Sequence, residues 1–423
     1  SIFDIISYYI MFLLLSNSPM LLVAGACIFL ALAIWIPNHA FTIIDPYPSF
    51  EIEKVDLPSP NKDDPLLVDV EHVLQGFEAP EDGFLFDDKN DWIWSMGNGD
   101  LLRVNLRTMT SVPFAHTGET HINCGSLQME SRCGRPLGLL KLPTEDHVRY
   151  QKFFDNVTDN ETPLCLVADA YKGLLLVSSK GTIVPLLTNV VGKPLLFANA
   201  MTRARSGIIY LSDSSKRWLR NQVLLEQLES RPTGRVISWN PDTEKSTVVA
   251  ENLPFPNGIV LHNDQSLLVS LTTRHQIVRI NLTINDGDGQ KPELFAALPG
   301  IPDNLHVSYS DEWKRSVLWV GTATKSSAVT HWLNRLPKLR KLLAMMFPPH
   351  FLMKCFKRYG LLLALDADTG KLLHAYQDPT GATSYIAGIH FDDTYAYIGS
   401  WLNHFLARIP REKLFSVDLN NNI

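Results

Sequence analysis

A short strand-like pattern recurs six times along the chain, and this recurrence constrains the fold more than any other feature. Each copy is a run of β-branched, aliphatic or aromatic residues that ends in a small or acidic residue before a turn. The six copies are Trp92–Ser95, Leu166–Asp169, Ile209–Asp213, Leu267–Ser270, Leu318–Gly321 and Tyr395–Gly399. Because radially arranged four-stranded sheets bury their faces against one another, the pattern predicts an all-β, six-bladed β-propeller.

The longest gap between copies contains a basic amphipathic stretch, which we expect to form a helical insert over residues 329–358. Three placements are open. The insert covers the central opening of the propeller, contacts a membrane surface, or packs on the side of a blade.

The N-terminal segment is almost free of charge from Ile5 to Ile36, and its most apolar part is Met20–Ile36. A bilayer core needs roughly 20 apolar residues in a helix, so residues 1–37 are expected to form a transmembrane anchor. A cleaved signal peptide is the alternative, but the segment lacks a basic start and a clear cleavage site. Residues 38–70 then form a Pro-rich linker, residues 71–412 the propeller and residues 413–423 a C-terminal tail.

The cysteines and glycosylation sequons point to a lumenal or extracellular propeller. Cys124 and Cys133 lie close together in a glycine-containing loop, where either a disulfide or two reduced thiols is open. Sequons begin at Asn156, Asn160 and Asn281. A protein of the mitochondrial inner membrane that faces the intermembrane space is the alternative location. A net charge of −6 without a basic stripe argues against nucleic acid as a partner and leaves the membrane lipid bilayer as the expected one.

Five strings in the body are specific enough to suggest a family. They are Cys133–Gly138, Val167–Leu174, Ile209–Ser215, Phe255–Gly258 and Gly300–Asn304. With these strings the body resembles the strictosidine-synthase-like propellers, most closely their adipocyte plasma membrane-associated branch, from about Glu78 to Arg408. The resemblance implies a disulfide between Cys124 and Cys133, because that branch has the same spacing.

The resemblance also implies a Ca²⁺ site in the central tunnel. The matching positions are Glu81, Asn199, Asn257, Asp303 and Asn304, and all of them carry side-chain oxygens, as Ca²⁺ requires. The alternative is that Asn257 and Asn304 are ordinary turn residues. Ala200 stands where the family commonly has an aspartate, which puts a second, structural ion in doubt.

The resemblance implies little about catalytic side chains, which remain unknown. Ala387 occupies the place of the acid/base glutamate of the alkaloid-forming synthases, so we do not expect strictosidine synthesis. Leu137 stands where paraoxonase-like hydrolases have a histidine, and His121, His306 and His390 are more often structural than catalytic.

Two functions stay open. The first is a Ca²⁺-dependent hydrolase of small lipophilic esters or lactones, in which the metal polarises a carbonyl. The second is a non-catalytic binding or accessory subunit of a membrane protein complex. An open tunnel mouth above the metal favours the first function, and a mouth plugged by the insert favours the second.

Overall fold

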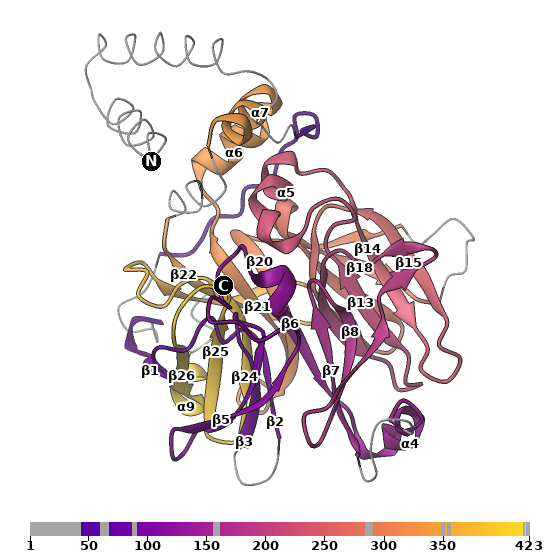
Figure 1. The fold of residues 1–423 in the computed structure, drawn as a ribbon. Coiled ribbons are helices and arrows are strands. Elements are labelled where there is room, and N and C mark those ends of the chain that lie inside the picture. The colour runs from indigo at the N-terminus through magenta and orange to yellow at the C-terminus, as the bar shows by residue number, and fades with distance from the viewer. Residues whose placement is uncertain are drawn as a thin grey trace, which may run out of the picture.

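Six antiparallel four-stranded sheets make up the protein in the computed structural model, which describes residues 44–59, 67–86, 91–154, 161–283, 291–347, 352, 357–417 and 419. Figure 1 shows the sheets side by side around a centre, which confirms the predicted six-bladed propeller.

The strands of each blade follow one another along the chain, from the innermost strand outward. The first three blades are β2 (Gly83–Leu85), β3 (Asp91–Ser95), β4 (Asp100–Asn105) and β5 (Thr110–His116); β6 (Pro136–Lys141), β7 (Pro163–Asp169), β8 (Gly173–Ser178) and β9 (Ile183–Leu187); and β12 (Ala198–Arg203), β13 (Ile209–Asp213), β14 (Gly234–Trp239) and β15 (Ser246–Leu253). A two-stranded hairpin, β10 (Asn189–Val190) and β11 (Lys193–Pro194), joins the second and third blades.

The remaining three blades repeat this order, and the last borrows a strand from the start of the body. They are β16 (Pro256–His262), β17 (Ser266–Leu271), β18 (Gln276–Asn281) and β19 (Glu293–Ala297); β20 (Gly300–Ser310), β21 (Arg315–Lys325), β22 (Gly360–Asp366) and β23 (Leu372–Asp378); and β24 (Ile386–Phe391), β25 (Tyr395–Ser400), β26 (Leu406–Pro410) and β1 (Glu71–Val73). All six runs predicted from the sequence belong to the second strands of the blades.

The ring closes where β1 pairs with β26, with Glu71 opposite Arg408 and Val73 opposite Leu406. Arg408 Nε also donates to Glu71 Oε2 at 2.7 Å. Because a strand from the beginning of the body completes the last blade, the first and last blades cannot separate unless the pairing of β1 with β26 breaks.

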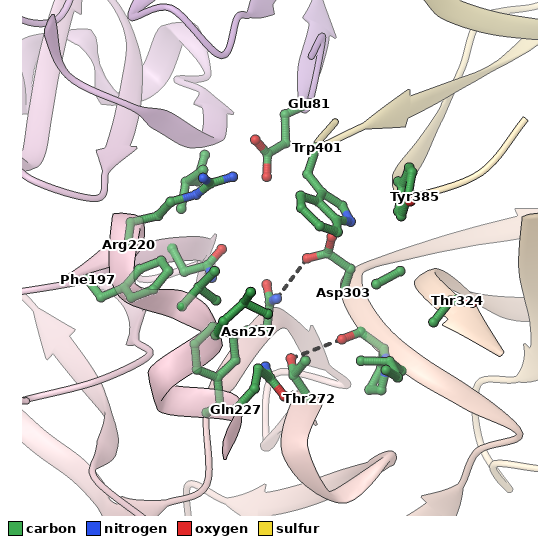
Figure 2. A pocket seen from close by; sticks show the side chains of 18 residues that line it. Glu81, Phe197, Arg220, Gln227, Asn257, Thr272, Asp303, Thr324, Tyr385 and Trp401 are labelled. Carbon is green, nitrogen blue, oxygen red and sulfur yellow. Dashed lines mark hydrogen bonds between the residues drawn. The ribbon is translucent and has the colours of Figure 1, made fainter. Parts of the chain in front are cut away.

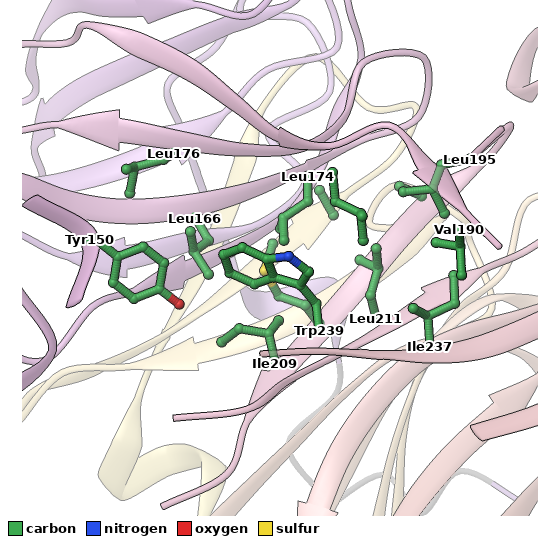
Figure 3. Close-up of a cluster of buried hydrophobic side chains, with 14 of the residues drawn as sticks. Tyr150, Leu166, Leu174, Leu176, Val190, Leu195, Ile209, Leu211, Ile237 and Trp239 are labelled. Atoms are coloured by element: carbon green, nitrogen blue, oxygen red, sulfur yellow. The ribbon is translucent and has the colours of Figure 1, made fainter. Parts of the chain in front are cut away.

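The hydrophobic core lies between neighbouring blades. In the cluster of Figure 3, Leu166, Leu174 and Leu176 of the second blade meet Ile209, Leu211, Ile237 and Trp239 of the third. Trp239 is only 1% exposed. Burial of each such large side chain stabilises the fold by roughly 1.5–3 kcal/mol, so the blades depend on one another.

Short helices cover the ends of the blades. They are α3 (Glu130–Cys133), α4 (His147–Gln151), α5 (Val223–Glu229), α6 (Ala328–Asn334), α7 (Pro337–Met346) and α9 (Arg411–Leu414), with 3₁₀ turns η1 (Leu67–Asp69), η2 (Thr144–Asp146), η3 (Arg220–Gln222) and η4 (Thr272–Arg274). We call α5, α6 and α7 the helical cap, because they lie together at one end of the propeller, opposite α4 (Figure 1).

The helices α6 and α7 lie within the stretch expected as a helical insert, between β21 and β22. Ser327 accepts a hydrogen bond from the Thr330 backbone N–H and so caps α6, while Pro337 begins α7, where its missing N–H has no helical partner to lose. In the part of the chain that the structure describes, no helix combines the length and apolar character needed to cross a bilayer. The expected anchor, residues 1–37, lies outside that part.

Candidate metal centre and cavity

The innermost strands share a local irregularity at their beginnings, and this irregularity places the candidate ligands. The register of β12, β16 and β20 against the next strand shifts across Ala198–Met201, Pro256–Ile259 and Pro302–Leu305. Bulges of this kind re-aim side chains at the rim of a sheet. Asn199, Asn257, Asp303 and Asn304 lie within these shifts, and Glu81 lies two residues before the start of β2.

The structure brings Glu81, Asn199, Asn257 and Asp303 to one cavity at the centre, and each is no more than 8% exposed. We call these four residues together with Asn304 the central ring. Asn257 Nδ2 donates to Asp303 Oδ1 at 2.7 Å, as Figure 2 shows. Asn199 Nδ2 donates to Ser214 Oγ at 2.9 Å. Asn304, the next residue of β20, lines a second hollow below the ring.

Two ring oxygens are buried without a hydrogen-bond partner among the described residues: Asn257 Oδ1 and Asn304 Oδ1. A buried polar atom without a partner costs about 1–3 kcal/mol, so native proteins rarely keep one unless a ligand, ion or water satisfies it. Asn257 Oδ1 and Asn304 Oδ1 are therefore the ring oxygens that a ligand, an ion or a water molecule would satisfy.

The ring carboxylates are desolvated. Burial raises the pKa of Glu81, and the neighbouring Arg135 and Arg220 guanidinium groups oppose that rise. Burial raises the pKa of Asp303 well above its ordinary value, and the charge of Glu81 adds to the effect. Two carboxyl groups that resist ionisation in this way would both be stabilised in their charged form by a cation between them.

Two buried arginines at the centre were not predicted from the sequence. Arg135 Nη2 donates to Glu81 Oε2 at 2.9 Å and to the Trp401 backbone oxygen at 3.0 Å. Arg220 Nη1 donates to Glu130 Oε1 at 2.8 Å, and its side chain lines the cavity (Figure 2). Arg135 stands inside the string Cys133–Gly138, so a charged residue in that buried string was the available signal.

The cavity above the ring has mostly apolar walls, and its enclosed space and the adjoining solvent-open space together amount to about 820 Å³. Its walls are built by Leu137, Phe197, Phe255, Ile301, Tyr385 and Trp401 from the blades and by Val223, Leu224 and Gln227 from α5. None of the described residues of α6 and α7 lines it. The described residues of the predicted insert therefore do not plug the mouth, and α5 forms the side wall that the sequence did not reveal.

Below the ring, a second hollow of about 1400 Å³ runs along all six innermost strands. His306 and His390 line this lower groove, with ring centroids 5.9 Å apart. His390 Nε2 lies 2.8 Å from Asp82 Oδ1, and burial lowers the pKa of His306 to about 4. His121 is in the exposed disulfide loop, so none of the three histidines reaches the cavity above the ring.

Leu137 and Ala387 are the two positions for which the sequence resemblance implies catalytic groups in other members of the wider family. Leu137 lies at the register shift of β6 and lines the cavity, and Ala387 lies at the corresponding shift of β24 and is buried. Within the described residues, no three His, Cys, Asp or Glu side chains come together as a metal-binding group. The ring differs from such a group because three of its five residues are asparagines, which contribute amide oxygens.

The disulfide between Cys124 and Cys133 is present, with Cα atoms 5.7 Å apart. Cys165 is buried and free. Asn281 is exposed at the end of β18, where its Oδ1 accepts hydrogen bonds from the Thr283 backbone and hydroxyl. Asn156 and Asn160 lie outside the described residues.

Known proteins share both the sequence and the fold of this chain. A family model described as strictosidine synthase matches residues 199–285. An adipocyte plasma membrane-associated protein from Salmo salar is 30% identical over 75% of this chain and 72% of its own length. The chain belongs to the strictosidine-synthase-like family. A second member, strictosidine synthase-like protein 10 from Arabidopsis thaliana, is 30% identical over 79% of this chain and 85% of its own length.

Solved structures outside this family share its propeller fold. A gluconolactonase from Xanthomonas campestris superposes with a TM-score of 0.52 at 15% identity and covers 89% of this chain and 99% of its own. A protein described as a putative gluconolactonase gives a TM-score of 0.51 at 14% identity, over 85% of this chain and 97% of its own. At this level of identity the likeness extends to the fold alone.

Proposed function

We propose that this strictosidine-synthase-like protein is a membrane-anchored propeller whose central ring binds Ca²⁺ and whose cavity hydrolyses small lipophilic esters or lactones. The observation that carries the proposal is that polar groups of the central ring are buried without enough hydrogen-bond or charge partners. Buried carboxyl groups with raised pKa values and the unpartnered Asn257 Oδ1 line an apolar cavity, and the unpartnered Asn304 Oδ1 belongs to the next residue after Asp303.

The ring residues fit Ca²⁺ better than other metals. Glu81 and Asp303 supply two negative charges, and Asn199, Asn257 and Asn304 supply neutral oxygens, which suits a hard divalent cation that takes six to eight oxygen ligands. The Arg135 guanidinium binds Glu81 through Oε2, and the described contacts leave Oε1 for a metal. Arg135 would therefore orient Glu81 without displacing the ion.

A Ca²⁺ ion bound in the ring would polarise the carbonyl group of an ester or lactone. Side chains of the protein would bind the substrate and transfer the proton. The apolar walls, including Phe197 and Phe255, would hold the lipophilic part of the substrate and exclude water from it. Asp303, held in its ionised form by the metal, would accept a proton from the attacking water.

Membrane attachment through residues 1–37 belongs to the same proposal, and relatives are named plasma membrane-associated proteins. The disulfide Cys124–Cys133 supports a lumenal or extracellular propeller, because disulfides persist in oxidising compartments. The intermembrane space of mitochondria is the alternative compartment.

A second candidate function is a binding or accessory subunit of a membrane protein complex. It is favoured by Leu137 and Ala387, since an apolar side chain cannot transfer a proton at either position. In that case the Ca²⁺ ion is structural and the cavity holds a ligand without turnover.

Hydrolysis of a panel of aryl esters and lactones by the full chain, with Ca²⁺ and with a chelator, separates the two functions. The proposal predicts turnover that needs Ca²⁺ and is lost in Leu137→Arg, which fills the cavity with a charged side chain. Leu294→Arg places the same charge on an exposed strand and should keep full turnover. No turnover of any substrate by the folded wild-type chain would remove the hydrolase and favour the accessory subunit.

A further inference from the structure

The first described residues of the chain pack onto the helical cap. Ile44 is completely buried in a cluster with Trp218, Leu225 and Ala344, the last two from α5 and α7. The Asp45 backbone N–H donates to Glu229 Oε1 at 2.6 Å. The segment expected as part of a linker is therefore tied to the cap from its first described residue.

The contacts continue along the following residues. The Tyr47 backbone N–H donates to the Glu229 oxygen at 2.7 Å, and the Phe50 N–H donates to the Asn334 oxygen at 3.3 Å. Arg340 of α7 is 1% exposed and donates to the Tyr47 and Leu228 backbone oxygens. A buried arginine whose Nη1 and Nη2 groups donate to backbone carbonyls of two segments fixes the segment to the cap more firmly than a surface contact would.

This attachment limits how far the cap can lie from the apolar N-terminal segment. Pro37 ends that segment, and Ile44 lies seven positions further along the chain. An extended chain spans at most about 3.6 Å per residue, so the two points lie within about 25 Å of one another. The opposite end of the propeller, where α4 lies in Figure 1, has no such tether among the described residues.

The cap also carries the surface chemistry of a bilayer interface. Val329 and Trp332 are 64% and 56% exposed and share one face of α6 at i, i+3 spacing. Lys338 and Lys341 are exposed on α7 at the same spacing. Tryptophan favours the headgroup region, and lysines near an anionic surface gain about 1 kcal/mol each.

Acidic groups near these residues do not cancel the positive charge. Glu51 pairs with Arg335 at 3.0 Å, and Glu226 and Glu229 of α5 are buried and bonded within the cap. Lys338 and Lys341 have no ion-pair partner among the described residues.

We propose that the helical cap is the membrane-facing surface of the propeller and lies on the headgroups of the anionic bilayer that holds residues 1–37. This inference rests on the proposed membrane anchor. Because α5 is both part of the cap and a wall of the cavity, the cavity mouth then opens toward the bilayer. Lipophilic molecules would reach the central ring from the membrane surface, and the lower groove would face away from it.

The test is spin labelling of the full chain in nanodiscs with and without phosphatidylserine. Cys27 and Cys355 are replaced by serine, and Cys165 is left in place because it is buried and its thiol pKa is raised by burial. Labels are placed by Val329→Cys and Trp332→Cys on the cap. The matched control is Val148→Cys on α4, which is 85% exposed. Collisions with oxygen and with a water-soluble nickel complex report burial in lipid.

We expect the cap labels to gain oxygen collisions and lose nickel collisions several-fold relative to position 148, and more so with phosphatidylserine. Lys338→Gln with Lys341→Gln should remove the phosphatidylserine effect. Cap labels as accessible to nickel as position 148, in a chain that floats with vesicles, would overturn this inference and leave the anchor intact. A loss of collisions with both oxygen and nickel would show that protein covers the cap, and this result would also overturn the inference. A chain that does not float would contradict the anchor and the inference together.

Discussion

The two ends of the central tunnel are built from the same six strands, yet they differ in how their polar groups are satisfied. Asp82, at the lower groove, accepts hydrogen bonds on both carboxylate oxygens, from the Gly83 and Leu139 backbones, and lies against His390. Glu81, its neighbour in sequence, lines the cavity at the cap end, where Asn257 Oδ1 has no partner among the described residues and burial raises the pKa of Asp303. One step along the chain thus separates Asp82, whose two carboxylate oxygens both accept hydrogen bonds, from the ring, where Asn257 Oδ1 and Asn304 Oδ1 have no partner among the described residues. Buried polar groups without hydrogen-bond partners in a native fold indicate a ligand site.

The largest expected effect comes from breaking the buried pair at the cap end. Arg135→Gln leaves Glu81 buried without its partner, and removing one member of such a pair costs about 3–5 kcal/mol of the free energy of unfolding. Added Ca²⁺ should restore part of this loss, because a cation in the ring would neutralise Glu81. Thermal unfolding of the full chain with and without Ca²⁺ measures both effects.

The matched control for that prediction is Arg235→Gln, which breaks the equally buried pair of Arg235 and Asp213. It should destabilise the fold by a similar amount without any rescue by Ca²⁺. Equal rescue of both variants would show that Ca²⁺ acts elsewhere. It would contradict a Ca²⁺ site at the cap end of the tunnel.

A smaller effect is expected in how the free energy of unfolding depends on pH, through Glu226 in the cap. Burial raises the pKa of Glu226 in α5 to about 8, although Ser215 and Thr233 donate to it. Because the folded state holds this proton more tightly than the unfolded state, its stabilising contribution is complete below pH about 4.5 and is lost as the pH rises toward 8.

The variant Glu226→Gln should remove the fall in the free energy of unfolding between pH 5 and about 8. At about pH 8 it should raise that free energy by a few kcal/mol, which is the order expected for a pKa shift of this size. Denaturation of the full chain between pH 5 and about 8 follows the slope. Glu251→Gln, an exposed change on β15, is the control and should leave the slope as it is. An unchanged slope in Glu226→Gln would contradict the buried, protonated state.

The smallest effect is expected at the lower groove. His390→Gln loses the contact with Asp82 but keeps a side chain that can donate, so the free energy of unfolding should fall by about 1 kcal/mol. Affinity for Ca²⁺, measured by calorimetry, should stay within a few-fold of the wild type. A large loss of Ca²⁺ affinity would mean that the two ends of the tunnel are one site.

The sequence predicted the propeller because the second strand of every blade repeats a recognisable run, as in Trp92–Ser95 and Ile209–Asp213. It also located the ring residues, since strings such as Phe255–Gly258 fall at the bulges of the inner strands. It did not reveal Arg135 or Arg220, because their partners come from other blades or distant loops, and pairing across such distances leaves no local pattern. The wall made by α5 was missed for the same reason, because its place over the cavity depends on packing between distant segments.

The most direct test of the account is the thermal stabilisation of the full chain by Ca²⁺ in three forms: wild type, Glu81→Gln with Asp303→Asn, and Asp82→Asn. A ligand at 100 times its dissociation constant stabilises the folded state by about 2.7 kcal/mol. We predict that Ca²⁺ raises the melting temperature of the wild type and of Asp82→Asn and leaves the double variant unchanged. No Ca²⁺ response in the wild type, or the same response in the double variant, would contradict a calcium site at the central ring.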